Sequence, residues 1–119
     1  MTTTPAARRK AVPLPLEREL VDAIRDMLNQ FGVLHWSGRI YVRRSGRRAF
    51  LPALGTGTPD IIGVVRGRMF AIEAKRSDKD RARDSQMDWM RLARAHGIAC
   101  GVARTVSEAQ AIFVQAERS

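Results

Sequence analysis

Apolar residues recur every three or four positions in the first third of the chain, which is the spacing of one helix face. They are Leu16, Leu20, Ile24, Leu28 and Phe31. Pro15, just before this series, suits the first turn of a helix, and Gly32, just after it, suits the end. The pattern therefore predicts an amphipathic helix that starts at Leu16 and ends before Gly32.

Short apolar segments separated by turn residues come next, at residues 33–36, 39–42 and 47–51. They predict short strands joined by tight turns. Two longer and mostly apolar runs, Ile61 to Val65 and Met69 to Ala74, flank the sequence Arg-Gly-Arg at 66–68. This arrangement predicts a largely buried β-hairpin at the centre of the sheet.

The last third of the chain has the pattern of a helix, a strand and a second helix. Apolar residues recur at helical intervals within residues 84–96, small residues at 98–103 predict a strand, and Ser107 is predicted to open the final helix. Only the connection through the helix at 84–96 has to join parallel strands. The predicted fold class is therefore α/β, with a central mixed β-sheet flanked by helices.

The length of 119 residues fits one compact domain. We expect a folded domain at residues 16–119 and a flexible basic arm at residues 1–15, because three prolines stand there without apolar periodicity. One cysteine, Cys100, cannot form an intrachain disulfide, which fits a cytoplasmic or nucleoid location. No run of about 18 apolar residues is present, so no membrane span is expected.

The charge of the chain points to a polyanionic partner. Lysine and arginine number 21 against 12 aspartates and glutamates, a formal net charge of +9, and this favours nucleic acid over a merely solvated basic surface. The predicted ribbon at residues 39–51 is especially basic. It either lies along a phosphate backbone or is an exposed edge protected by charge. Its arginines are Arg39, Arg43, Arg44, Arg47 and Arg48.

Two carboxylates are expected to meet at one end of the buried hairpin. If the hairpin turns on Arg66 and Gly67, Asp60 lies opposite Glu73. Directly opposed residues bring their Cβ atoms within about 5 Å, and two such charges repel each other unless a cation lies between them. The absence of His and Cys from this pair favours Mg²⁺ or Mn²⁺ over zinc.

A lysine and a further acid are candidates for the same site. Glu73 and Lys75 point to one face of the strand because side chains alternate. Beside two carboxylates, Lys75 should stay protonated at neutral pH and stabilise charge on a phosphate. Glu17, on the flank of the first helix, is the candidate third acid, and Glu19 is a weaker alternative. Taken alone, Glu-x-Lys is also a common pattern of a solvated surface strand.

The motifs together resemble the VRR-NUC branch of the PD-(D/E)xK nucleases. The resemblance rests on Gly-Thr-Pro-Asp-Ile-Ile-Gly at 57–63, Phe-Ala-Ile-Glu-Ala-Lys at 70–75, and Gln86 in the later helix. It implies a restriction-endonuclease-like αβββαβ core, with metal bound by Asp60, Glu73 and the backbone carbonyl of Ala74. Glu17 matches the acid of the first helix, and Gln86 matches a polar residue that bonds to the attacking water or to Lys75. One departure is Ala74, where the family often has Val.

We therefore expect a Mg²⁺- or Mn²⁺-dependent DNA endonuclease of replication or repair, with Lys75 and Arg76 adding to the DNA contacts of the ribbon. Cutting both strands calls for two protomers, and stand-alone members of the family resemble homodimeric junction resolvases. A branched DNA is thus the expected substrate. Two alternatives remain: a nucleic-acid-binding module without catalysis, and a nuclease subunit of a larger repair, packaging or restriction complex.

Overall fold

The computed structural model describes residues 13–44, 46–52, 54–76 and 84–119. A four-stranded sheet forms its centre, in the order β1-β4-β5-β6. Strands β1 (Leu34–Ser37), β4 (Ile61–Val65) and β5 (Arg68–Ala74) are antiparallel neighbours, and β6 (Ala99–Ala103) runs parallel to β5. The mixed sheet confirms the predicted α/β class, and the parallel pair is the one joined through a helix.

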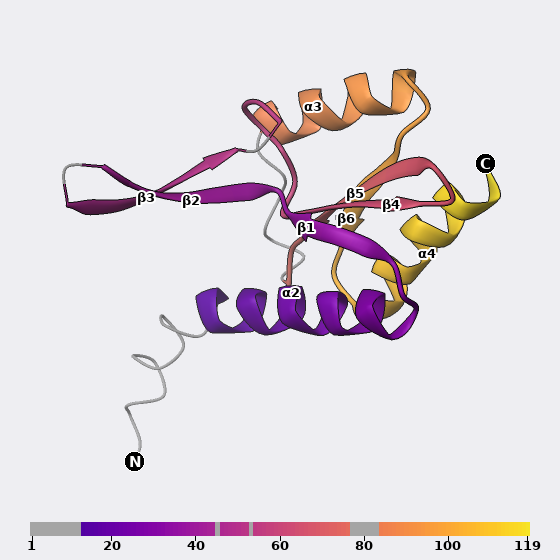
Figure 1. Ribbon diagram of the computed structural model, residues 1–119, viewed down its shortest axis with the longest axis horizontal. Helices are drawn as coiled ribbons and strands as arrows, with labels where there is room; N and C mark the ends of the chain where they lie inside the picture. Colours follow the sequence, from indigo (N-terminus) through magenta and orange to yellow (C-terminus); the bar gives the residue numbers. More distant parts are fainter. Residues whose placement is uncertain (1–12, 45, 53, 77–83) are drawn as a thin grey trace, which may run out of the picture.

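Helices cover both faces of this sheet (Figure 1). Helices α2 (Pro13–Gln30) and α4 (Val106–Arg118) pack on one face, and α3 (Asp84–Ala95) packs on the other. The alternation of side chains along the strands explains the division. Ile61 and Ile72 contribute to the cluster under α2 and α4, whereas Ile62 and Ala71 contact the cluster under α3.

A basic ribbon projects from this body (Figure 1). It consists of β2 (Arg39–Arg44) and β3 (Arg47–Pro52), which form a separate two-stranded antiparallel sheet. The ribbon confirms the two-stranded projection expected from the sequence. In its backbone register, Arg43 stands opposite Arg48 and Arg44 opposite Arg47.

The ends of two helices differ from the prediction. Helix α2 begins at Pro13 rather than Leu16, because prolines are accommodated in a first helical turn, where backbone N–H groups have no helical partner. Residues 1–12 of the expected basic arm lie outside the described residues. Helix α4 begins at Val106 rather than Ser107, because the Thr105 side chain caps it by accepting a hydrogen bond from the Glu108 backbone N–H.

The hairpin of β4 and β5 turns where the sequence places it. Arg66 and Gly67 have φ angles of 54° and 78°, the left-handed values of a two-residue type I′ turn. Val65 then pairs with Arg68, and the ladder continues to Ile61 opposite Ile72. This register fixes which side chains meet at the far end of the hairpin.

In the part of the chain that the structure describes, no helix combines the length and the apolar composition of a membrane-spanning segment.

Candidate active site

Asp60 and Glu73 meet at the end of the β4–β5 hairpin. They lie one position beyond the last pair of the ladder, as the sequence-based register predicted. The Asp60 backbone N–H donates to Glu73 Oε1 at 3.1 Å, and the Ala74 N–H donates to Asp60 Oδ2 at 3.0 Å. Each carboxylate is thus held by the backbone of the opposing strand. These two hydrogen bonds link the acids to each other without the help of a residue from another element.

Glu73 is the most buried charge of this pair. Its exposed fraction is 0%, and its pKa is raised from 4.5 to about 7. Burial is the largest cause, and repulsion from Asp60 adds to it, while Lys75 and Arg39 act in the opposite direction. A carboxylate with this environment is short of positive charge. It is a site that a cation would stabilise.

Two cationic side chains approach the pair from different elements. Lys75 Nζ lies 3.3 Å from Glu73 Oε2, and its backbone N–H donates to Ala103 O on β6. The Arg39 guanidinium lies 3.2 Å from Asp60 Oδ1 and 4.0 Å from Glu73 Oε2. Lys75 therefore comes from the end of the strand that carries Glu73, as predicted, whereas Arg39 comes from the base of the ribbon. The sequence does not predict the ion pairs of Arg39. It places Arg39 only among the five arginines of the ribbon that are expected to contact DNA.

Gln86 closes the site from helix α3. Its side chain is buried, and Nε2 donates to Glu73 Oε2 at 2.8 Å. The loop before Asp60 allows helix α3 to approach because Gly57 has no side chain. A Cβ at this position would lie 2.1 Å from the Ser85 carbonyl oxygen. Trp89 forms a second contact between helix α3 and this loop, since its Nε1 donates to the Leu54 carbonyl oxygen. Gln86 therefore orients the Glu73 carboxylate, while its predicted contact with the attacking water or Lys75 stays a prediction.

Glu17 is not grouped with the other acids. Among the described residues, no three His, Cys, Asp or Glu side chains are close enough together to hold a metal ion. The layering of the sheet gives the reason. Helix α2, which carries Glu17, packs on the face of Ile72 and Ala74, whereas Glu73 lies on the face covered by α3. The structure thus gives the predicted third metal ligand no support.

The remaining predicted DNA contacts are placed only in part. Arg43, Arg44, Arg47 and Arg48 lie on the ribbon by their backbone positions, and their side chains lie outside the described part. Arg76 is exposed directly after β5, next to Lys75.

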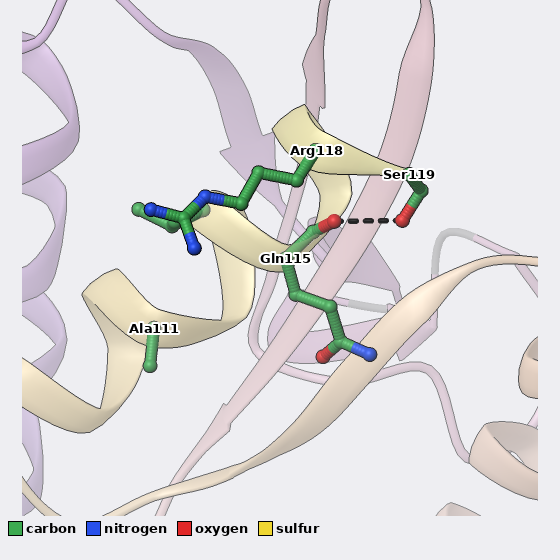
Figure 2. Close-up of a pocket in the computed structure, with 5 residues that line it drawn as sticks. Ala111, Gln115, Arg118 and Ser119 are labelled. Carbon is green, nitrogen blue, oxygen red and sulfur yellow. Dashed lines mark hydrogen bonds between the residues drawn. The ribbon is translucent and has the colours of Figure 1, made fainter.

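Two hollows elsewhere on the surface lack this chemistry. One, of about 460 Å³, is lined by residues of α4 and the chain end (Figure 2). No Asp or Glu side chain lines it, and the Ser119 hydroxyl donates to the Gln115 carbonyl oxygen. The other, of about 520 Å³, is lined by Arg66, Arg68, Glu117 and Arg118. Neither is lined by a residue of the acid pair or its partners, so the candidate site is the end of the β4–β5 hairpin.

The donor set suits a small divalent cation. Two carboxylates from adjacent strands offer hard oxygen ligands, and Mg²⁺ binds through one or two carboxylates while retaining water. The unfavourable proximity of Asp60 to Glu73 would be relieved by a cation between them. These residues fit a cation that takes a few oxygen ligands from the protein and the others from water. They do not fit a zinc site, whose ligands would include His or Cys.

We expect the raised pKa of Glu73 to make stability depend on pH. The folded protein holds this proton up to about pH 7, whereas the unfolded chain releases it near 4.5. The resulting stabilisation is fully present below pH 4.5 and is lost as the pH rises through 7. At about 1.4 kcal/mol per tenfold change in proton affinity, the loss is about 3 kcal/mol. Urea unfolding in EDTA at pH 5 and pH 8 measures it. Glu73→Gln should show a smaller loss, and an equal loss in both proteins would contradict the assignment.

Comparison with solved structures identifies the class of this fold. A structure described as a VRR_NUC domain matches with a TM-score of 0.60, over 83% of this chain and 95% of that chain, at 16% sequence identity. No family model and no curated protein matches the chain. At this level of identity the similarity shows a shared fold. The chain has the fold of a VRR_NUC domain, which is the fold that its motifs resemble.

Proposed function

We propose that this protein is a divalent-metal-dependent DNA endonuclease. The observation that carries the proposal is the linked pair Asp60 and Glu73, with Lys75 beside it, at the end of a hairpin in a VRR_NUC fold. Glu73 is fully buried, and its pKa is raised to about 7, which is the kind of perturbation that gathers at functional sites. A second carboxylate beside it completes the pair of oxygen donors through which Mg²⁺ is often bound.

Each residue has a separate task in this proposal. Asp60 and Glu73 would hold Mg²⁺ or Mn²⁺, with the Ala74 carbonyl as a further ligand. The Ala74 N–H already faces Asp60, and a strand residue directs its N–H and C=O to the same side. When bound, such a cation lowers the pKa of a coordinated water and neutralises charge on a phosphoryl oxygen. Gln86 keeps the Glu73 carboxylate oriented. Lys75 stabilises the negative charge that develops on the scissile phosphate.

The substrate of the proposal is DNA, with a branched molecule preferred. The basic ribbon beside the site supports a polyanion. One site cuts one strand, so we propose a homodimer that places two sites on a two-fold axis. Equilibrium sedimentation would show the expected mass of two chains, and a mass of one chain would remove the paired-cut model without affecting the single site.

A cleavage assay tests the activity. Labelled four-way junction, flap, duplex and single-stranded DNA are incubated with the protein and Mg²⁺, Mn²⁺ or EDTA. We expect cutting with either metal, none in EDTA, and the fastest cutting of the junction. DNA binding without cutting under every metal would overturn the enzyme and favour a non-catalytic binding module. Weak cutting that a partner protein strengthens would instead favour a nuclease subunit of a larger complex.

A further inference from the structure

The Arg39 guanidinium lies between the two carboxylates of the proposed metal site. It is 3.2 Å from Asp60 Oδ1 and 4.0 Å from Glu73 Oε2, so one cationic group contacts both acids. Lys75 Nζ lies 3.3 Å from Glu73, on the strand that carries this acid. Arg39 thus has the bridging position that a cation shared by the pair would take. Two cations cannot share that position, because they repel each other at short distance.

The backbone of Arg39 is held in place at this point. The preceding Gly38 N–H donates to the Asp60 carbonyl oxygen at 2.7 Å, and a Cβ on Gly38 would lie 1.7 Å from the Pro59 carbonyl oxygen. Ser37 Oγ accepts from the Arg39 N–H and donates to the Arg39 carbonyl oxygen. The base of the ribbon is therefore packed against Pro59 and Asp60, directly before β4. A change in the guanidinium position must come from the side chain.

We propose that Arg39 is the resident counter-cation of the acid pair, and that a divalent cation must displace its guanidinium from Asp60 and Glu73 in order to bind. The inference rests on the proposed function, because it takes these acids as the metal ligands. The Arg39 side chain is 39% exposed, so it has open solvent into which to turn. The displaced guanidinium stays tethered at the base of the ribbon, where the phosphate of a bound DNA strand would lie.

Metal affinity without DNA tests this directly. Mn²⁺ is titrated into the purified protein by calorimetry, beside Arg39→Gln. Removing the competing guanidinium should tighten Mn²⁺ binding by about tenfold, since a charge-assisted contact to two carboxylates no longer has to be broken. Arg91→Gln is the matched control. It also removes one positive charge from an ion pair with an aspartate, but on the exposed surface of α3, and its Mn²⁺ affinity should stay within about twofold of the wild type.

A thermal readout separates competition from a merely structural contact. In EDTA, Arg39→Gln should unfold at a lower temperature than the wild type, because the acids lose a counter-ion. In saturating Mn²⁺ this difference should vanish or reverse. A structural role alone would lower the unfolding temperature equally in both conditions, and that result would overturn the proposal.

Arg39→Lys keeps the test decisive if the glutamine variant does not fold. A lysine is a single point charge that cannot reach both carboxylates as a guanidinium does, so we expect Mn²⁺ to bind it about threefold more tightly than the wild type. Unchanged or weaker Mn²⁺ binding in both Arg39 variants would overturn the role of Arg39 and leave the metal site standing. If Mn²⁺ binds neither the wild type nor any variant, the metal site itself fails, and the proposed function fails with it.

Discussion

Replacing Glu73 by glutamine should lower metal-dependent DNA cleavage by at least about a thousandfold, equivalent to about 4 kcal/mol of transition-state stabilisation. Glutamine keeps the size of the side chain and can still accept the Asp60 N–H through its carbonyl oxygen. It removes the negative charge that a divalent cation needs. The Gln86 amide, which donates to Glu73 Oε2, can turn over so that its oxygen accepts from the NH₂ group of the new glutamine. The loss should therefore arise from metal binding and not from unfolding.

The measurement is a cleavage rate at several Mn²⁺ concentrations, with circular dichroism to confirm the fold. Glu19→Gln serves as the matched control, because it makes the same chemical change at an exposed position of α2, and Glu19 belongs to no group of three acids among the described residues. That variant should cut at the wild-type rate. Full activity of Glu73→Gln would show that this carboxylate is not a metal ligand, and the proposed active site would then be wrong.

Replacing Lys75 by glutamine should lower the cleavage rate by about a hundred- to a thousandfold while Mn²⁺ still binds. The lysine ammonium lies 3.3 Å from Glu73 Oε2 and only 14% of the side chain is exposed. It is thus held beside Glu73, which is the proposed metal ligand. Removing its charge takes away stabilisation of the phosphate in the transition state. It also removes a neighbouring positive charge, so Mn²⁺ affinity should not fall.

Single-turnover cleavage at saturating DNA and Mn²⁺ isolates this effect on the chemical step. Arg76→Gln is the control: it removes a positive charge from the exposed neighbouring position. It should weaken DNA binding and reduce the salt dependence of that binding, but leave the single-turnover rate close to that of the wild type. If Lys75→Gln behaves in the same way, Lys75 is a DNA-binding residue and has no role in the chemical step.

The central hairpin could be predicted from the sequence in detail. Arg66 and Gly67 mark a two-residue turn, and the period of two along each strand then sets every pair of the ladder. The meeting of Asp60 and Glu73 follows from that register without any knowledge of the other elements. The same holds for the shared face of Glu73 and Lys75. These relations are local, since they depend on residues within about fifteen positions of one another.

The parts of the site that come from distant elements could not be predicted in this way. Glu17 had a plausible helix position, but the face on which α2 packs decides its distance from Glu73. Arg39 is one of five arginines in a basic ribbon, and no feature of the sequence marks it as the one that contacts the acids. Gln86 was singled out by its match to a family motif. Its bond to Glu73 depends on how α3 docks against the sheet.

The sequence by itself determined the α/β class, the hairpin register and the acid–lysine pair, because side-chain periodicity and turn chemistry act over short stretches of chain. The tertiary structure alone decided which residues from distant elements contact the site and how deeply the site is buried. It placed Arg39 on both carboxylates, kept Glu17 out of their group, and buried Glu73 so that its pKa rises to about 7. These properties depend on which helices cover which face and on how much solvent they exclude. Burial and long-range charge contacts are set only when the layers have packed together.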